Sequence, residues 1–179
     1  MIQKVDDIRQ SKWATRAWTY QETLLSKRRL YFTEYQLYFE SSYCVRCEWK
    51  DAIATNRHWI YSQGAWFSKP SDIYKCIDSY TRRSLTFQSD ALNAILGILA
   101  VYERKFQVHH LWEMPYMETG LSSPLDPAMA RSLFFRALKG SVRCTKFPSW
   151  SWAGWTGKEI LAVHLGDDLE LYLSALRSC

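Results

Sequence analysis

The sequence predicts a mixed fold, of the α/β or α+β class, in which short strands at both ends of the chain surround about three to four helices. The chain has 179 residues, of which 47% are hydrophobic and 16% aromatic, including nine Trp. This composition provides an aromatic-rich core and excludes wholesale disorder. Segments with helical spacing alternate with short segments rich in Tyr, Phe and Leu, and this alternation indicates both kinds of element.

Residues 13–25 are expected to form the first helix. Its apolar stripe is predicted to hold residues at helical spacing, namely Ala14, Trp18, Gln21 and Leu25. The basic run at 27–29 then follows the helix, where cations interact favourably with the negative end of the helix dipole.

Two short strands are predicted at 29–33 and 36–41. Leu30 and Phe32 would share one face of the first strand, and Leu37 and Phe39 one face of the second. If no further strand pairs with these two, the four side chains would form an exposed sheet edge that favours pairing or aggregation. Residues 44–70 show no sustained period and are predicted to be mostly loop.

Three further helices are predicted, at 71–84, 90–106 and 126–140. In the first, Ser71 is the expected N-cap. Its apolar stripe is Ile73, Cys76, Ile77 and Tyr80. In the second, the stripe is Leu92, Ile95, Leu96, Leu99 and Tyr102. The third would begin at Asp126-Pro127 and end at Gly140, and short strands would follow at 160–164 and 169–173.

Glu22 is the carboxylate with the clearest chemical potential. On a helix it lies one turn after Trp18 and one turn before Leu25, beside the apolar stripe. Partial desolvation there would suit acid/base work or the stabilisation of a cation. The alternative is an ion pair or hydrogen bond that fixes the helix on its neighbours.

Other chemical signals are weaker. Cys44 and Cys47 form a C-x-x-C pair without a second ligand pair at a zinc-finger spacing, so no metal is expected. No Gly-rich phosphate loop is present. The net charge of +5 is interspersed and indicates a solvated face rather than a nucleic-acid site. No signal peptide or membrane span is visible, and reduced thiols in a cytoplasmic protein account for the five Cys.

Residues 147–155 read Phe-Pro-Ser-Trp-Ser-Trp-Ala-Gly-Trp. In an extended segment Trp150 and Trp152 would face the same side. We interpret this run as an aromatic strap that seals the core, rather than as a platform for carbohydrate or base stacking, because few basic residues accompany it.

Three segments together resemble the fungal heterokaryon-incompatibility (HET) domain family. Residues 16–32 are similar to the family's R-x-W-T-x-Q-E…L-S…R-x-L-x-F run. Residues 80–98 resemble the region that follows the domain, and residues 147–155 resemble the P-S-W-S-W-A-G-W signature. The family's upstream Y-x-A-L-S-Y-x-W-G and W-I-D-x-x-C-I-x-Q segments are absent from this sequence.

The resemblance implies that residues 1–50 are the C-terminal part of a HET-like domain. Residues 51–70 would then be a loop region, and residues 71–179 a helical post-HET region that ends in short strands. Members of the family trigger programmed cell death when unlike fungal strains fuse, so a cell-death protein that acts through protein partners or self-association is expected.

The family has also been compared with Toll/interleukin-1 receptor-like domains, some of which cleave NAD. By that resemblance the alternative is an NAD hydrolase, with NAD as substrate and no resident cofactor. Glu22 would be its catalytic carboxylate, with Trp18, Gln21 and Arg16 as binding residues. Cleavage of a glycosidic bond to nicotinamide requires a carboxylate that stabilises oxocarbenium-like charge.

Overall fold

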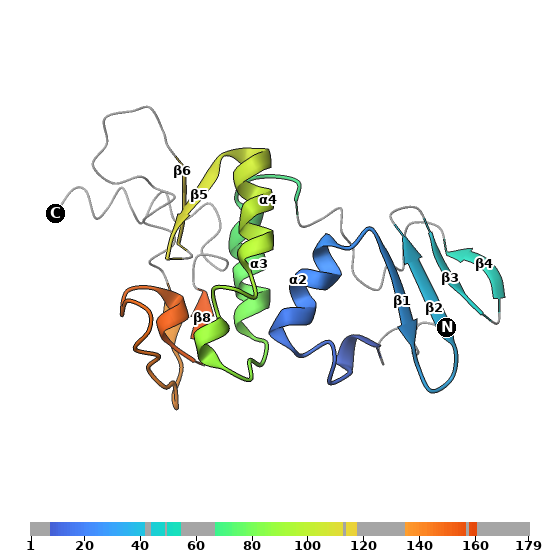
Figure 1. Ribbon diagram of the computed structural model, residues 1–179, viewed down its shortest axis with the longest axis horizontal. Helices are drawn as coiled ribbons and strands as arrows, with labels where there is room; N and C mark the ends of the chain where they lie inside the picture. Colours follow the sequence, from blue (N-terminus) through green and yellow to red (C-terminus); the bar gives the residue numbers. More distant parts are fainter. Residues whose placement is uncertain are drawn as a thin grey trace.

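The computed structural model describes residues 8–41, 44–48, 50–54, 67–112, 114–117, 135–156 and 158–160. These residues form an α+β structure, as the sequence predicts (Figure 1). In Figure 1 a four-stranded sheet lies at one end of the molecule. Helix α2 (Ala17–Leu25) separates it from a larger part that contains α3 (Asp72–Thr81) and α4 (Leu96–Phe106).

The sheet is antiparallel, with the strand order β1-β2-β3-β4. Its strands are β1 (Arg28–Phe32), β2 (Leu37–Ser41), β3 (Val45–Cys47) and β4 (Lys50–Ala54). The predicted β1 and β2 are confirmed within a residue at most boundaries. In their register Leu30 lies opposite Phe39, and Phe32 lies opposite Leu37.

Residues 44–70 are predicted to be mostly loop, and this prediction misses the strands β3 and β4. The 51–70 loop region accordingly begins inside a strand, and residues 55–66 lie outside the described residues. Both strands are short and one carries a register irregularity, so neither shows a sustained alternation that a periodicity argument detects.

The main hydrophobic core lies between α2, α3 and α4. Helix α3 buries the predicted stripe completely: Ile73, Cys76, Ile77 and Tyr80 are at most 2% exposed. Ser71 occupies the N-cap position, but its side chain makes no capping hydrogen bond. The carboxylate of Asp72 instead accepts hydrogen bonds from the backbone N–H groups of Ser68 and Lys69.

The predicted stripe of α2 is wrong. Trp18 and Leu25 are exposed, and the helix buries Ala17, Tyr20 and Leu24 instead. Tyr20 packs against Tyr80 of α3, with ring centroids 6.4 Å apart. Helix α2 is therefore rotated about its axis so that the phenol of Tyr20 is buried and the larger indole of Trp18 is not.

Helix α4 begins later than predicted, because the 3-10 turn η2 (Gln88–Asp90) is followed by further turns at 91–95. Ile95, Leu99 and Tyr102 of the predicted stripe are buried, whereas Leu96 is exposed. A hairpin follows that the sequence analysis missed, formed by β5 (Val108–Leu111) and β6 (Met114–Met117).

The predicted helix at 126–140 is wrong where it is described. Residues 126–134 lie outside the described residues, and β7 (Phe135–Ala137) is a strand paired with β8 (Lys158–Ile160). Gly140 has a φ of 87°, as a turn requires. The strand predicted at 160–164 therefore begins at Lys158, while residues 161–164 and 169–173 lie outside the described residues.

The three segments that carry the family resemblance meet at Tyr80. Its ring lies against Tyr20 of the first segment and, at 5.8 Å, edge-to-face with Trp152 of the third. The Tyr80 hydroxyl donates a 2.6 Å hydrogen bond to the carbonyl of Ala91. The motif residues therefore build a shared core, which is a structural role.

Candidate functional site

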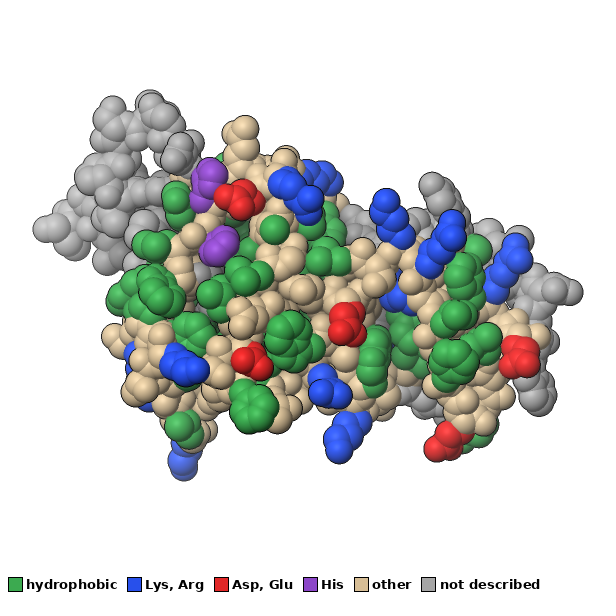
Figure 2. Space-filling view, viewed as in Figure 1, with side chains coloured by type: hydrophobic (Ala, Val, Ile, Leu, Met, Phe, Trp, Pro, Cys, Tyr) green, Lys and Arg blue, Asp and Glu red, His purple; other side chains and the backbone are tan. Residues whose placement is uncertain are grey.

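The β1–β2 hairpin differs from an ordinary half-buried sheet, because it exposes large apolar side chains and buries a charged pair beside Tyr31 and Tyr38. On β1 the apolar Leu30 and Phe32 are 55% and 82% exposed, whereas Arg29 and Tyr31 are buried. On β2, Glu40 is fully buried. Figure 2 shows the resulting patch of apolar side chains over the part of the molecule where β1 and β2 lie in Figure 1.

The buried face is organised by an ion pair. Arg29 Nε donates to Glu40 Oε2 over 3.1 Å, and the hydroxyl of Tyr31 donates to the same oxygen over 3.0 Å. Arg29 Nη1 also donates to the carbonyl of Thr23 in the last turn of α2. This contact confirms the predicted placement of a cation at the negative end of that helix and ties the sheet to α2.

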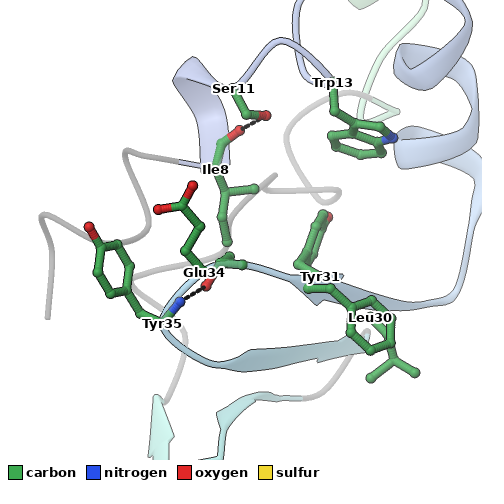
Figure 3. A pocket seen from close by; sticks show the side chains of 9 residues that line it. Ile8, Ser11, Trp13, Leu30, Tyr31, Glu34 and Tyr35 are labelled. Atoms are coloured by element: carbon green, nitrogen blue, oxygen red, sulfur yellow. Dashed lines mark hydrogen bonds between the residues drawn. The ribbon is translucent and has the colours of Figure 1, made fainter.

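A groove runs along β1, with a cavity volume of about 730 Å³ (Figure 3). We call it the β1 groove. One wall holds Ile8, Ser11 and Trp13, and the other is the continuous segment 30–35. The rings of Trp13 and Tyr31 meet edge-to-face at 5.7 Å, and in Figure 3 Glu34 and Tyr35 lie at the opposite end.

Glu22 lines a second, smaller cavity of about 170 Å³. Its wall is formed by Trp13, Glu22, Thr23, Ser26, Arg29, Leu30 and Tyr31. The carboxylate is exposed, so the desolvation expected beside the apolar stripe is not present, and no described residue forms an ion pair with it. The indole in this cavity is that of Trp13 and not that of Trp18.

The structure does not gather the other predicted site residues around Glu22. Gln21 Oε1 accepts a 2.7 Å hydrogen bond from the backbone N–H of Gly97 in α4. Arg16 is exposed and forms an isolated bridge with Ser84. Trp18 is 39% exposed and lines neither cavity. Neighbouring positions on one helix point in different directions, so only Glu22 reaches a cavity.

Sequence reasoning missed Trp13 and Arg29 as residues of the candidate site. The sequence predicts Trp13 at the start of the first helix, but residues 12–15 form turns, and these turns bring the indole over Tyr31. Arg29 was seen only as part of a basic run. The available signal was the pair Arg29 and Glu40, since opposite charges on adjacent strands indicate a cross-strand contact.

A cavity of about 170 Å³ is smaller than the roughly 300–1,000 Å³ of typical ligand pockets. It has room for one ring beside Glu22, whereas a dinucleotide would have to extend over Trp13 into the β1 groove. The guanidinium of Arg29 is already paired with Glu40, so it adds no unneutralised charge to attract a phosphate.

The remaining candidates do not form a second site within the described residues. Cys44 precedes β3, Cys47 is the last residue of that strand, and neither belongs to a disulfide. No three possible metal ligands gather in the described part of the chain. Trp152 is 1% exposed and seals the core, as predicted, but Trp150 is 41% exposed. The two rings do not share a side, because the 3-10 turn η3 (Trp152–Gly154) replaces the extended segment.

Each helix in the described ranges is too short or too polar to cross a membrane. No protein-family model, no curated protein and no solved structure matches this chain.

Proposed function

We propose that this chain is a fungal heterokaryon-incompatibility-type, cell-death-associated protein that acts in the cytoplasm through regulated interaction. Two kinds of observation support the proposal. The resemblance to the HET family rests on three segments, and these segments meet around Tyr80 in one core. Tyr20, Tyr80 and Trp152 of these segments therefore serve folding, and the surface remains for recognition.

The observation that carries the interaction role is the inverted β1–β2 hairpin. Leu30 and Phe32 face outward while the charged pair Arg29 and Glu40 is buried beneath them. Burying an ion pair while exposing two large apolar side chains is unfavourable for an isolated chain. A contiguous apolar patch of this kind is typical of an interaction surface.

The test is controlled expression of the chain in a filamentous fungus, with cell viability as the readout. We expect the wild type to kill cells and Phe32→Ser to abolish killing at equal protein levels. Leu111→Ser is the matched control, because Leu111 is also an exposed apolar strand residue but lies on β5. Viable cells with the wild type, or full killing by Phe32→Ser, would contradict the proposal.

A second candidate function is NAD cleavage, which is favoured by one observation. Glu22 opens into a cavity beside Trp13 instead of lying in a closed ion pair. Release of nicotinamide from NAD by the purified chain, lost in Glu22→Gln and retained in Cys47→Ser, would support it. If the wild-type chain released no nicotinamide from NAD, NAD cleavage would be excluded as a function of this chain.

A further inference from the structure

The β1 groove lies at the open edge of the sheet. Among the described strands β1 pairs with β2 alone. Successive side chains of β1 point to opposite faces, yet Leu30, Tyr31 and Phe32 all line the same groove, together with residues 33–35 of the turn that follows the strand. Side chains of both faces border one cavity only where the cavity lies beside the strand edge. The groove therefore has the position that an added strand would occupy.

The sequence of this segment is complementary to itself when two copies run antiparallel. With Tyr31 opposite Tyr31, Arg28 of each copy lies opposite Glu34 of the other, and Leu30 lies opposite Phe32. Arg28, Leu30 and Phe32 share one face of β1, so these side chains of the two copies would lie on the same face of the joined sheet, and Glu34 lies two residues beyond the strand, in the turn to β2. The basic end of each segment therefore meets the acidic end of the other copy, and the apolar residues in the middle of the two segments meet each other.

The two charges are available for such a contact. Arg28 and Glu34 are exposed, and among the described residues neither has an ion-pair partner. Glu34 lines the groove, and Figure 3 shows it at the end away from Trp13. The second copy's Arg28 would lie at that end of the groove.

We propose that two copies of this chain associate through antiparallel β1–β1 pairing, which joins their sheets across a two-fold axis near Tyr31. The proposal deepens the proposed function, because it names the partner as a second copy and the surface as the β1 edge. Two-fold pairing uses the same patch on both subunits. The contact is small by the standard of stable interfaces, so we expect a dissociation constant on the order of micromolar.

The test is sedimentation of the full chain over a range of concentrations, with charge-reversed variants. Arg28→Glu and Glu34→Arg should each weaken association by about tenfold or more, because each places like charges opposite one another twice. An equimolar mixture of the two variants should restore association, since both cross-strand pairs are then opposite in charge. The double variant in one chain should restore it as well.

The matched control is Arg46→Glu. Arg46 is exposed and lies opposite Phe39 on the same sheet face, but on β3 rather than at the edge. We expect the Arg46→Glu variant to associate as strongly as the wild type. If Arg46→Glu weakened association as much as Arg28→Glu does, the two copies would be stacking their sheets face to face, and the proposed pairing at the β1 edge would be overturned. A monomeric wild type at about 100 micromolar, or no restoration on mixing, would also overturn it.

This measurement is independent of the cell-death assay. Association without killing contradicts the proposed function and leaves the β1 pairing intact. Killing that persists in a monomeric Arg28→Glu variant retains the proposed function and refutes a role for this pairing in it.

Discussion

The side-chain oxygen Oε1 of Gln21 accepts a hydrogen bond from the backbone N–H of Gly97 over 2.7 Å. Gly97 lies in the first turn of α4, where backbone N–H groups have no partner within their own helix. Gln21 therefore caps α4 from a different helix. A residue of the segment that resembles the HET family serves here to join α2 to α4.

Replacing Gln21 tests this capping role. Gln21→Leu should lower the free energy of unfolding by about 1 kcal/mol, because the Gly97 N–H loses its acceptor. Gln21→Glu should retain most of the stability, because a carboxylate is also an acceptor and is favoured at a helix N-terminus. Denaturant unfolding measures both. Equal losses in the two variants would mean that side-chain packing, and not capping, is what Gln21 contributes.

Gly97 itself is required by the same contact. A Cβ atom at this position would lie 2.8 Å from Cδ of Gln21 and 2.8 Å from Cδ1 of Leu25. Gly97→Ala should therefore destabilise the protein by about 1–3 kcal/mol, although alanine favours helices over glycine. The double variant Gly97→Ala with Gln21→Ala relieves the clash with Gln21. Its loss in unfolding free energy should therefore be smaller than the sum of the losses in the two single variants. Strict additivity in thermal or denaturant unfolding would contradict the close approach.

The sequence predicted the elements that have a regular apolar period. Helix α3 is the clearest case, since all four residues of its predicted stripe are buried. The β1–β2 hairpin was predicted from its aromatic and aliphatic alternation. The alternation does not state which face is buried. Here the buried face carries the neutralised pair Arg29 and Glu40 together with Tyr31 and Tyr38, which pack with Ile8.

The candidate site was only partly predictable for a related reason. Glu22 was placed correctly on a helix, but Trp13 approaches the cavity through turns at 12–15 that have no period. Gln21 lies next to Glu22 in the sequence, yet its partner Gly97 is 76 residues away. Contacts between residues so far apart in the sequence depend on how the helices pack, and the spacing of residues within one segment carries no information about that packing.

The conformation of residues 147–155, the third segment of the family resemblance, depends on Arg143. Replacing Arg143 gives a further prediction. Arg143 donates hydrogen bonds to the carbonyls of Cys144, Phe147 and Gly154, and its guanidinium lies 5.5 Å from the ring centre of Trp155. Arg143→Lys keeps the charge but loses the planar set of donors. We expect a loss of about 2 kcal/mol in unfolding free energy and a change in Trp fluorescence.

Gly154→Ala should have a comparable effect on the Arg143 clamp, the set of hydrogen bonds that Arg143 donates, since a Cβ there would lie 2.5 Å from Nη1 of Arg143 and 2.6 Å from the carbonyl oxygen of Pro148. Gly140→Ala is an informative comparison: its Cβ would meet no atom within 4 Å, so any loss there reflects only its positive φ. A Trp signal that changes equally in the Gly140 and Gly154 variants would contradict the clamp.

The buried ion pair of the sheet is the next target. Glu40→Gln should destabilise the protein by about 3 kcal/mol, because it leaves the charge of Arg29 buried without its counter-charge. Glu22→Gln, at an exposed carboxylate, should change stability by less than about 0.5 kcal/mol. Urea unfolding measures both. If Glu40→Gln were as stable as Glu22→Gln, the Arg29–Glu40 pair would not hold the hairpin together.

The pH dependence of stability should report the thiol of Cys76. Burial is the main cause that raises its pKa from 9.0 to about 11, and the side chain is completely buried. A raised pKa means that the folded protein retains the proton after the unfolded chain has lost it. The stabilisation is therefore complete below about pH 9 and disappears as the pH rises towards about 11. The loss amounts to about 3 kcal/mol at most, at 1.36 kcal/mol for each pKa unit.

Cys76→Ala separates this contribution from that of the buried phenols. Burial also raises the pKa of Tyr20 and of Tyr102, whose ordinary pKa is 10.0, so these groups act mainly above that pH. Between about pH 9 and 10 the wild type should lose stability with increasing pH, and the variant should lose distinctly less. Equal slopes for the Cys76 variant and the wild type would mean that the thiol ionises as readily in the folded protein as in the unfolded chain, which its burial against Tyr102 should prevent.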